Sequence, residues 1–90
     1  MDTLPLRTSQ NHYALRVRAQ TFIAQGKLPR SVPLRSVGGF GSDLECALCD
    51  EVVVKTAHEV EVFFLARPFE PYFFHRACYV LWFAESLMEK

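Results

Sequence analysis

The chain has 90 residues, of which 50% are apolar, 22% are charged and 13% are aromatic. This composition is typical of one small globular domain and excludes wholesale disorder and two independent cores. Ten basic and ten acidic residues balance, so net charge favours neither nucleic acid nor a membrane as partner. The longest strongly apolar run without charge, Ala77 to Ala84, is far shorter than the roughly 20 residues that span a bilayer. We therefore expect no membrane segment.

The first residues, Met1-Asp2-Thr3-Leu4-Pro5, lack the basic start and apolar stretch of a signal peptide. We accordingly expect the chain in a reducing cytoplasm. There its three cysteines are expected as thiols or metal ligands and not as disulfides.

In chain order, residues 1–10 are polar and contain proline, which predicts a flexible N-terminus. Residues 11–26 follow a helical pattern that ends at a glycine. The apolar residues that share one face of this helix are Leu15, Ala19, Phe22 and Ile23. Residues 27–43 are rich in proline and glycine, which predicts a connector. Residues 44–90 are dense in apolar and aromatic residues and form the predicted folded module.

Within this module, two runs rich in β-branched residues, Glu51 to Lys55 and Glu59 to Leu65, predict a β-hairpin with its loop at 56–58. Phe69 to Phe74 predicts a short extended segment, and His75 to Glu89 a closing helix. The predicted fold class is therefore a small α+β domain with an added N-terminal helix.

The charges are unevenly distributed along the chain. Residues 1–42 carry six basic residues and one acidic residue, whereas residues 43–90 carry four basic and nine acidic ones. This asymmetry indicates either a basic arm that binds nucleic acid or a basic half that packs on the acidic half. The residues of the candidate arm are Arg16, Arg18, Lys27, Arg30 and Arg35.

Four residues are the clearest candidate metal ligands: Cys46, Cys49, His75 and Cys78. They follow the pattern C-x₂-C, a gap of 25 residues, and H-x₂-C. Two cysteines separated by two residues can bring both sulfurs to one ion, and residues three apart share one face of a helix. Four ligands of this kind suit one tetrahedral, structural Zn²⁺ per chain. The alternative is that the cysteines are small core residues and the histidine is a helix cap.

Three thiolates on Zn²⁺ leave a formal charge of −1, for which Arg76 and the backbone N–H groups of the cysteine turn are candidate neighbours. With four protein ligands, no coordination position is left for an activated water. Asp50 and Glu51 then have no water to deprotonate, so we expect no enzyme and no small-molecule substrate.

The order of a cysteine turn, a hairpin and a helix with the second ligand pair resembles a treble-clef zinc finger. The ligand pattern is similar to the first zinc site of a LIM domain, although its gap is longer and no second ligand set follows Cys78. The motif Phe74-His75-x-x-Cys78-x-x-x-Trp82-x-x-Glu85, preceded by Gly38-Gly39-Phe40-Gly41, also resembles short uncharacterised bacterial zinc-finger proteins. The resemblance implies a zinc-binding fold and leaves the role open.

Two functions therefore remain open. One is a regulatory or nucleic-acid-associated zinc-finger protein that uses the basic arm. The other is a protein-interaction or dimerisation module that uses the last helix, in which zinc is purely structural. The aromatic residues of that candidate partner surface are Tyr79, Trp82 and Phe83.

Overall fold

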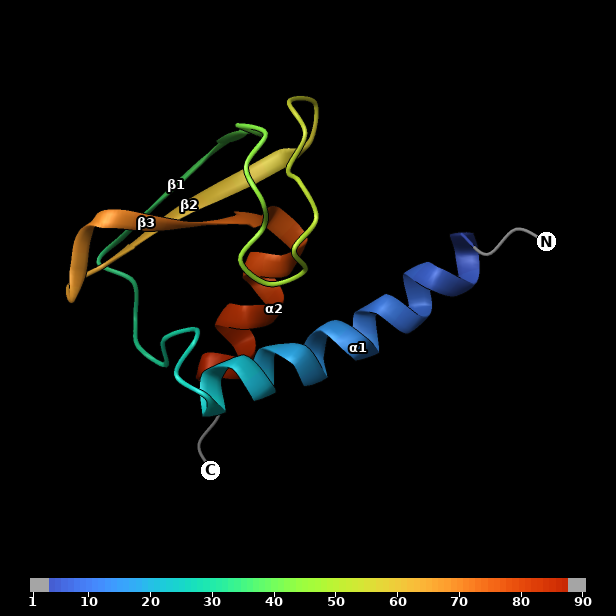
Figure 1. Ribbon diagram of the computed structural model, residues 1–90, viewed down its shortest axis with the longest axis horizontal. Coiled ribbons are helices and arrows are strands. Elements are labelled where there is room, and N and C mark those ends of the chain that lie inside the picture. Colours follow the sequence, from blue (N-terminus) through green and yellow to red (C-terminus); the bar gives the residue numbers. More distant parts are fainter. Residues whose placement is uncertain (1–3, 88–90) are drawn as a thin grey trace.

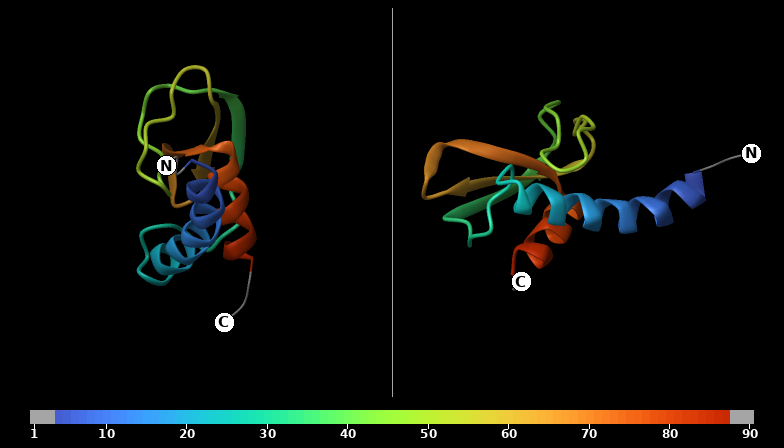
Figure 2. Two further views of the ribbon diagram at one scale, coloured as in Figure 1. Left: turned by 90° about the vertical axis from the view of Figure 1, so that its right-hand side faces the viewer. Right: turned by 60° about the horizontal axis from the view of Figure 1, so that its bottom comes forward.

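The computed structural model describes residues 4–87. Its elements are helix α1 (Leu4–Ala24), strands β1 (Arg35–Phe40), β2 (His58–Phe64) and β3 (Arg67–His75), and helix α2 (Arg76–Ser86). The strands form one antiparallel sheet in the order β1-β2-β3. Helix α2 packs on the sheet and α1 packs on α2, which gives three layers (Figures 1 and 2). The predicted α+β class is confirmed.

The core lies between the sheet and α2. Trp82, on α2, is fully buried and stacks on Phe74 of β3 with 5.6 Å between the ring centroids. Its ring also forms an edge-to-face pair with Phe64 of β2. Its indole N–H donates a hydrogen bond to the carbonyl of Pro29 at 2.9 Å, which ties the segment after α1 to the same core. These contacts fix α2, and with it the histidine and cysteine at its start, relative to the sheet.

Helix α1 docks on α2 through both apolar and charged contacts. Ala19 and Ile23 are buried on the face predicted from the apolar spacing. Beside them, the buried Glu85 carboxylate of α2 accepts hydrogen bonds from Arg16 Nε at 3.2 Å and Gln20 Nε2 at 3.0 Å. The helix begins at Leu4, earlier than the predicted residue 11, so residues 4–10 of the predicted N-terminal segment belong to the helix. Residues 1–3 of that predicted end lie outside the described part of the chain.

The predicted connector and hairpin need correction. The connector contains strand β1, which pairs with β2 from Arg35 opposite Phe63 to Phe40 opposite His58. Glycine-rich β1 has a single β-branched residue, Val37, and no alternation of a half-buried strand, and its pairing with β2 overrides that weak propensity. The hairpin is formed by β2 and β3, whereas 51–55 is not a strand.

Residues 44–53 instead fold back on themselves in a short ribbon, which we call the knuckle. Its two sides are joined by one bridge between Glu45 and Val52 and by a hydrogen bond from Val53 N to the Leu44 carbonyl at 2.8 Å. The valine-rich run that predicted a strand therefore closes the cysteine turn and does not pair with β2. No helix among residues 4–87 is long and apolar enough to cross a membrane.

Candidate metal centre

The knuckle presents the first two candidate ligands. Cys46 N donates to the carbonyl of Glu51 at 2.8 Å, and Asp50 N donates to the carbonyl of Cys46 at 3.0 Å, so the chain turns tightly around Cys46 and Cys49. Asp50 closes the turn with φ 69°, a left-handed conformation that aspartate tolerates better than most residues. Ala47 N donates to the carbonyl of Phe73 at 2.7 Å, which fixes the knuckle to β3.

The other two candidate ligands lie where β3 meets α2. His75 is the last residue of β3 and the N-cap of α2, and Cys78 lies in the first turn of that helix. The Cys46 and Cys78 side chains are buried, and those of Cys49 and His75 are half-buried. The spacing of three residues thus brings both side chains to the knuckle, as the sequence predicted.

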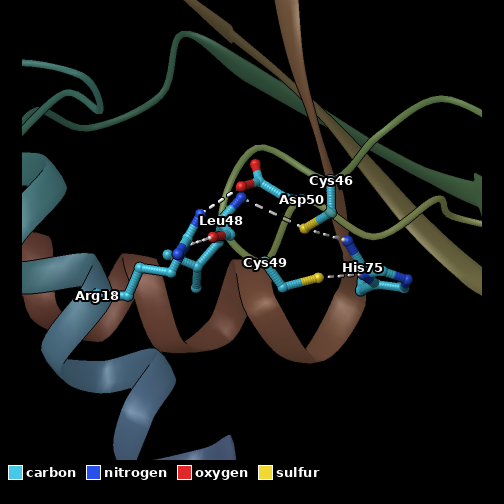
Figure 3. A network of polar contacts seen from close by, with 6 residues as sticks. All are labelled: Arg18, Cys46, Leu48, Cys49, Asp50 and His75. Atoms are coloured by element: carbon cyan, nitrogen blue, oxygen red, sulfur yellow. Dashed lines mark hydrogen bonds and ion pairs between the residues drawn. The ribbon is translucent and has the colours of Figure 1, made fainter.

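The four side chains form one cluster. One ligand atom from each of Cys46, Cys49, His75 and Cys78 lies within 4.8 Å of all the others. The Cys49 sulfur lies 3.3 Å from His75 Nδ1 (Figure 3). A tetrahedral zinc ion, with bonds of about 2.3 Å to sulfur and 2.0–2.1 Å to nitrogen, would place such a pair roughly 3.6 Å apart. The cluster therefore has the composition and nearly the size needed to hold one metal ion.

Backbone N–H groups surround the Cys46 sulfur. Leu48 N and His75 N each lie 3.4 Å from it and donate to it (Figure 3). A hydrogen bond from the Cys78 thiol, opposed by burial and supported by these N–H groups, lowers the pKa of Cys46 from 9.0 to about 4. Without a bound metal, Cys46 is therefore the thiolate of the cluster, and it accepts hydrogen bonds from the two backbone N–H groups and from the Cys78 thiol.

The other two thiols keep their protons more strongly. The hydrogen bond that Cys78 donates to Cys46, followed by burial, raises the pKa of Cys78. Burial is the main cause that raises the pKa of Cys49. A metal ion would displace these protons, because only thiolates bind zinc-like ions strongly.

Arg18 of α1, and not the predicted Arg76, contacts the knuckle. Its guanidinium donates to the carbonyl of Leu48 and to the carboxylate of Asp50 (Figure 3). Arg18 also lines a cavity of about 510 Å³ whose wall includes Cys49, His75 and Cys78. Arg76 is exposed, and its side chain forms no hydrogen bond or ion pair with a described residue. Sequence spacing favoured Arg76 because it adjoins His75, whereas the packing of α1 on α2 brings Arg18 to the site.

The other residues of the predicted basic arm are dispersed. Arg16 binds Glu85, and Lys27 lies 5.0 Å from the Phe22 ring centroid. The Arg35 guanidinium lies 4.4 Å from the Phe63 ring centroid, and Arg30 is exposed. Two of the five predicted basic residues, Arg16 and Arg18, thus bind acidic residues of the C-terminal half, which agrees with the internal-packing alternative.

The predicted aromatic partner surface is also corrected in one member. Tyr79 and Phe83 are half-buried and stack on each other with 5.8 Å between ring centroids. Trp82 has no exposed surface and belongs to the core. On α2 the exposed large apolar side chain is that of Val80, whereas Phe40 and Phe69 of the sheet are more exposed, at 69% and 90%.

No protein-family model, curated protein or solved structure matches this chain. Any assignment of function therefore comes from its own residues.

Proposed function

We propose that Cys46, Cys49, His75 and Cys78 bind one structural Zn²⁺ in a treble-clef-like arrangement. The observation that carries this proposal is the convergence of these four ligand atoms within 4.8 Å. Three sulfurs and one imidazole nitrogen are the ligands that zinc prefers in closed tetrahedral sites. The order of knuckle, β2–β3 hairpin and α2 supports the treble-clef comparison.

The ion would serve the fold and not catalysis. Four protein ligands fill a tetrahedral sphere, whereas catalytic zinc sites keep one position open for water or substrate. The four residues join the knuckle, the end of β3 and the start of α2. Zinc bound there would cross-link three segments of a small domain whose apolar core alone gives limited stability.

The role that we propose is a zinc-stabilised binding module with a protein partner. Arg16 and Arg18 form ion pairs with Glu85 and Asp50 of the same chain. A phosphate group would therefore have to compete with these carboxylates for the two arginines. Large apolar side chains remain exposed on the sheet and hairpin, including Phe40 and Phe69. Nucleic-acid binding needs free basic side chains, and two of the candidates are already paired. Exposed apolar side chains are typical of surfaces that bind proteins, so together the two observations favour a protein partner.

The metal is tested by native mass spectrometry of the protein purified without added metal or chelator. We expect one zinc per chain, and His75→Ala should lose it. His58→Ala is the matched control, because His58 is an exposed histidine outside the cluster and its loss should leave the zinc content unchanged. Wild-type protein that is folded and free of metal would refute the site.

The partner class is tested by fluorescence anisotropy with single-stranded and duplex DNA at low and physiological salt. We expect no binding at physiological salt, since two of the five candidate basic residues are paired internally. Salt-dependent binding that is lost on joint substitution of Lys27, Arg30 and Arg35 would instead support the nucleic-acid alternative.

A further inference from the structure

The two outer strands of the sheet differ in how they are protected against pairing with another strand. On β3, the carbonyl of Phe73 already accepts a hydrogen bond from Ala47 of the knuckle. That strand also carries the charged and proline residues that discourage pairing at an edge. These residues are Arg67, Pro68, Glu70 and Pro71. One edge of the sheet is therefore protected in several ways.

Strand β1 has almost none of these protections. All six of its residues are exposed, and it contains no proline, no lysine and no acidic residue. Its one charged side chain, Arg35, lies over the ring of Phe63 on the neighbouring strand. Val37 and Phe40 are 43% and 69% exposed. An exposed edge whose one charged side chain lies over a neighbouring ring is a ready template for another strand.

The ladder with β2 determines which backbone groups of β1 face outward. In antiparallel pairs, alternate residues direct both N–H and C=O to the same neighbouring strand. Gly41 N, just after β1, donates to the carbonyl of Ala57 at 2.9 Å, so residues 35, 37 and 39 face β2. The N–H and C=O groups of Ser36, Gly38 and Phe40 consequently point to the open edge.

Nothing within the chain itself requires glycine at two positions of β1. A Cβ atom on Gly38 or Gly39 would meet no atom within 4 Å, and neither residue has the positive φ that favours glycine. Glycine inside a strand weakens it, and often marks a place where another backbone approaches closely. Such an approach from outside would account for both residues.

We propose that the open edge of β1 pairs with β1 of a second copy of this chain, antiparallel about a two-fold axis at Gly38. The outward residues lie symmetrically around Gly38, so Ser36 would face Phe40 of the second copy. On the other face of the sheet, Val37 would lie opposite Gly39, and Arg35 opposite Gly41. Each large side chain meets a small one, and no like charges meet. The two sheets join into one of six strands.

This inference goes beyond the proposed function and does not depend on which metal is bound. It is tested by sedimentation velocity of the metal-loaded full chain from roughly 5 to 500 μM, the range suited to a short, weak interface. We expect a monomer–dimer equilibrium in the wild-type protein. Gly38→Glu and Gly38→Lys, which have room in the monomer, should each be monomeric because like charges meet at the axis. An equimolar mixture should recover the dimer, because Glu then faces Lys.

The control is Phe69→Glu, which removes a more exposed phenylalanine on the protected strand and should leave the dimer intact. Wild-type protein that stays monomeric throughout the range would overturn the proposal, as would a dimer that survives Gly38→Glu. If the Gly38 variants do not fold, amide hydrogen exchange of the wild-type protein tests the edge pairing instead. Protection of the Ser36, Gly38 and Phe40 amides should rise with concentration, and unchanged protection would refute edge pairing.

Discussion

Arg18 offers the sharpest test of how α1 supports the metal centre. Its guanidinium binds the carbonyl of Leu48 and the carboxylate of Asp50, and it lies 4.6 Å from the ring centroid of Phe22. A hydrogen bond to a backbone carbonyl contributes about 1 kcal/mol. The ion pair with Asp50 is two-thirds exposed on the carboxylate side, so solvent screening reduces it to at most about 0.5 kcal/mol.

Replacing Arg18 with alanine should therefore destabilise the zinc-loaded fold by about 1–2 kcal/mol. It should also weaken zinc binding by about tenfold, since partners that orient metal ligands typically contribute 10–100-fold to affinity. Two causes combine: the knuckle loses its support from α1, and a site of net charge −1 loses a nearby cation. Arg18→Lys keeps the charge but lacks the planar donor fork, so it should fall between alanine and wild type.

The assay is competition for zinc with a chromophoric chelator, together with urea unfolding of the zinc-loaded protein. Arg76→Ala is the matched control, because Arg76 adjoins His75 in sequence but its side chain forms no hydrogen bond or ion pair with a described knuckle residue. Arg76→Ala should change the zinc affinity by less than threefold. The reasoning would be refuted if Arg18→Ala bound zinc within twofold of wild type, or if both alanine variants lost affinity equally.

Three further results are expected. Gly41→Ala should cost about 2 kcal/mol or more in urea unfolding, because its Cβ would lie 2.0 Å from the carbonyl oxygen of Val54, whereas Gly39→Ala should change stability by less than about 0.5 kcal/mol. Calorimetry in buffers of different ionisation enthalpy should show about two protons released per zinc at pH 8, since Cys49 and Cys78 keep theirs in the metal-free chain; release of none would contradict that assignment. Glu85→Ala should loosen α1, which limited proteolysis detects as faster cleavage within the helix; an unchanged rate would mean that apolar contacts suffice.

The metal cluster was the part of the molecule most accessible from sequence. Ligand spacing is a local property: two residues between Cys46 and Cys49 specify a tight turn, and three positions separate His75 from Cys78 whatever the remaining chain does. For the two pairs to meet, the long segment between them had only to bring the chain back to the knuckle, and a hairpin does this. For that reason the cluster was predicted although the hairpin was placed in the wrong segment.

Features that depend on long-range packing were not accessible in this way. Strand β1 has a glycine-rich sequence with weak strand propensity, and its pairing with β2 supplies the order that its own residues do not. The run of valines at 52–54 has strong propensity, yet it closes the knuckle. Arg18 and Arg76 are equally plausible neighbours of the site by composition, and only the docking of α1 distinguishes them.

The docking of α1 also bears on the charge asymmetry of the chain. Two ion pairs between described residues join the basic N-terminal half to the acidic C-terminal half, Arg16 with Glu85 and Arg18 with Asp50. One pair fixes α1 to α2, and the other fixes α1 to the knuckle, so the same helix connects the core to the metal centre. Because Asp50 ends the cysteine turn, metal binding and the position of α1 should be energetically linked. A variant that frees α1 should then weaken metal binding, and removal of the metal should free α1 by the same factor.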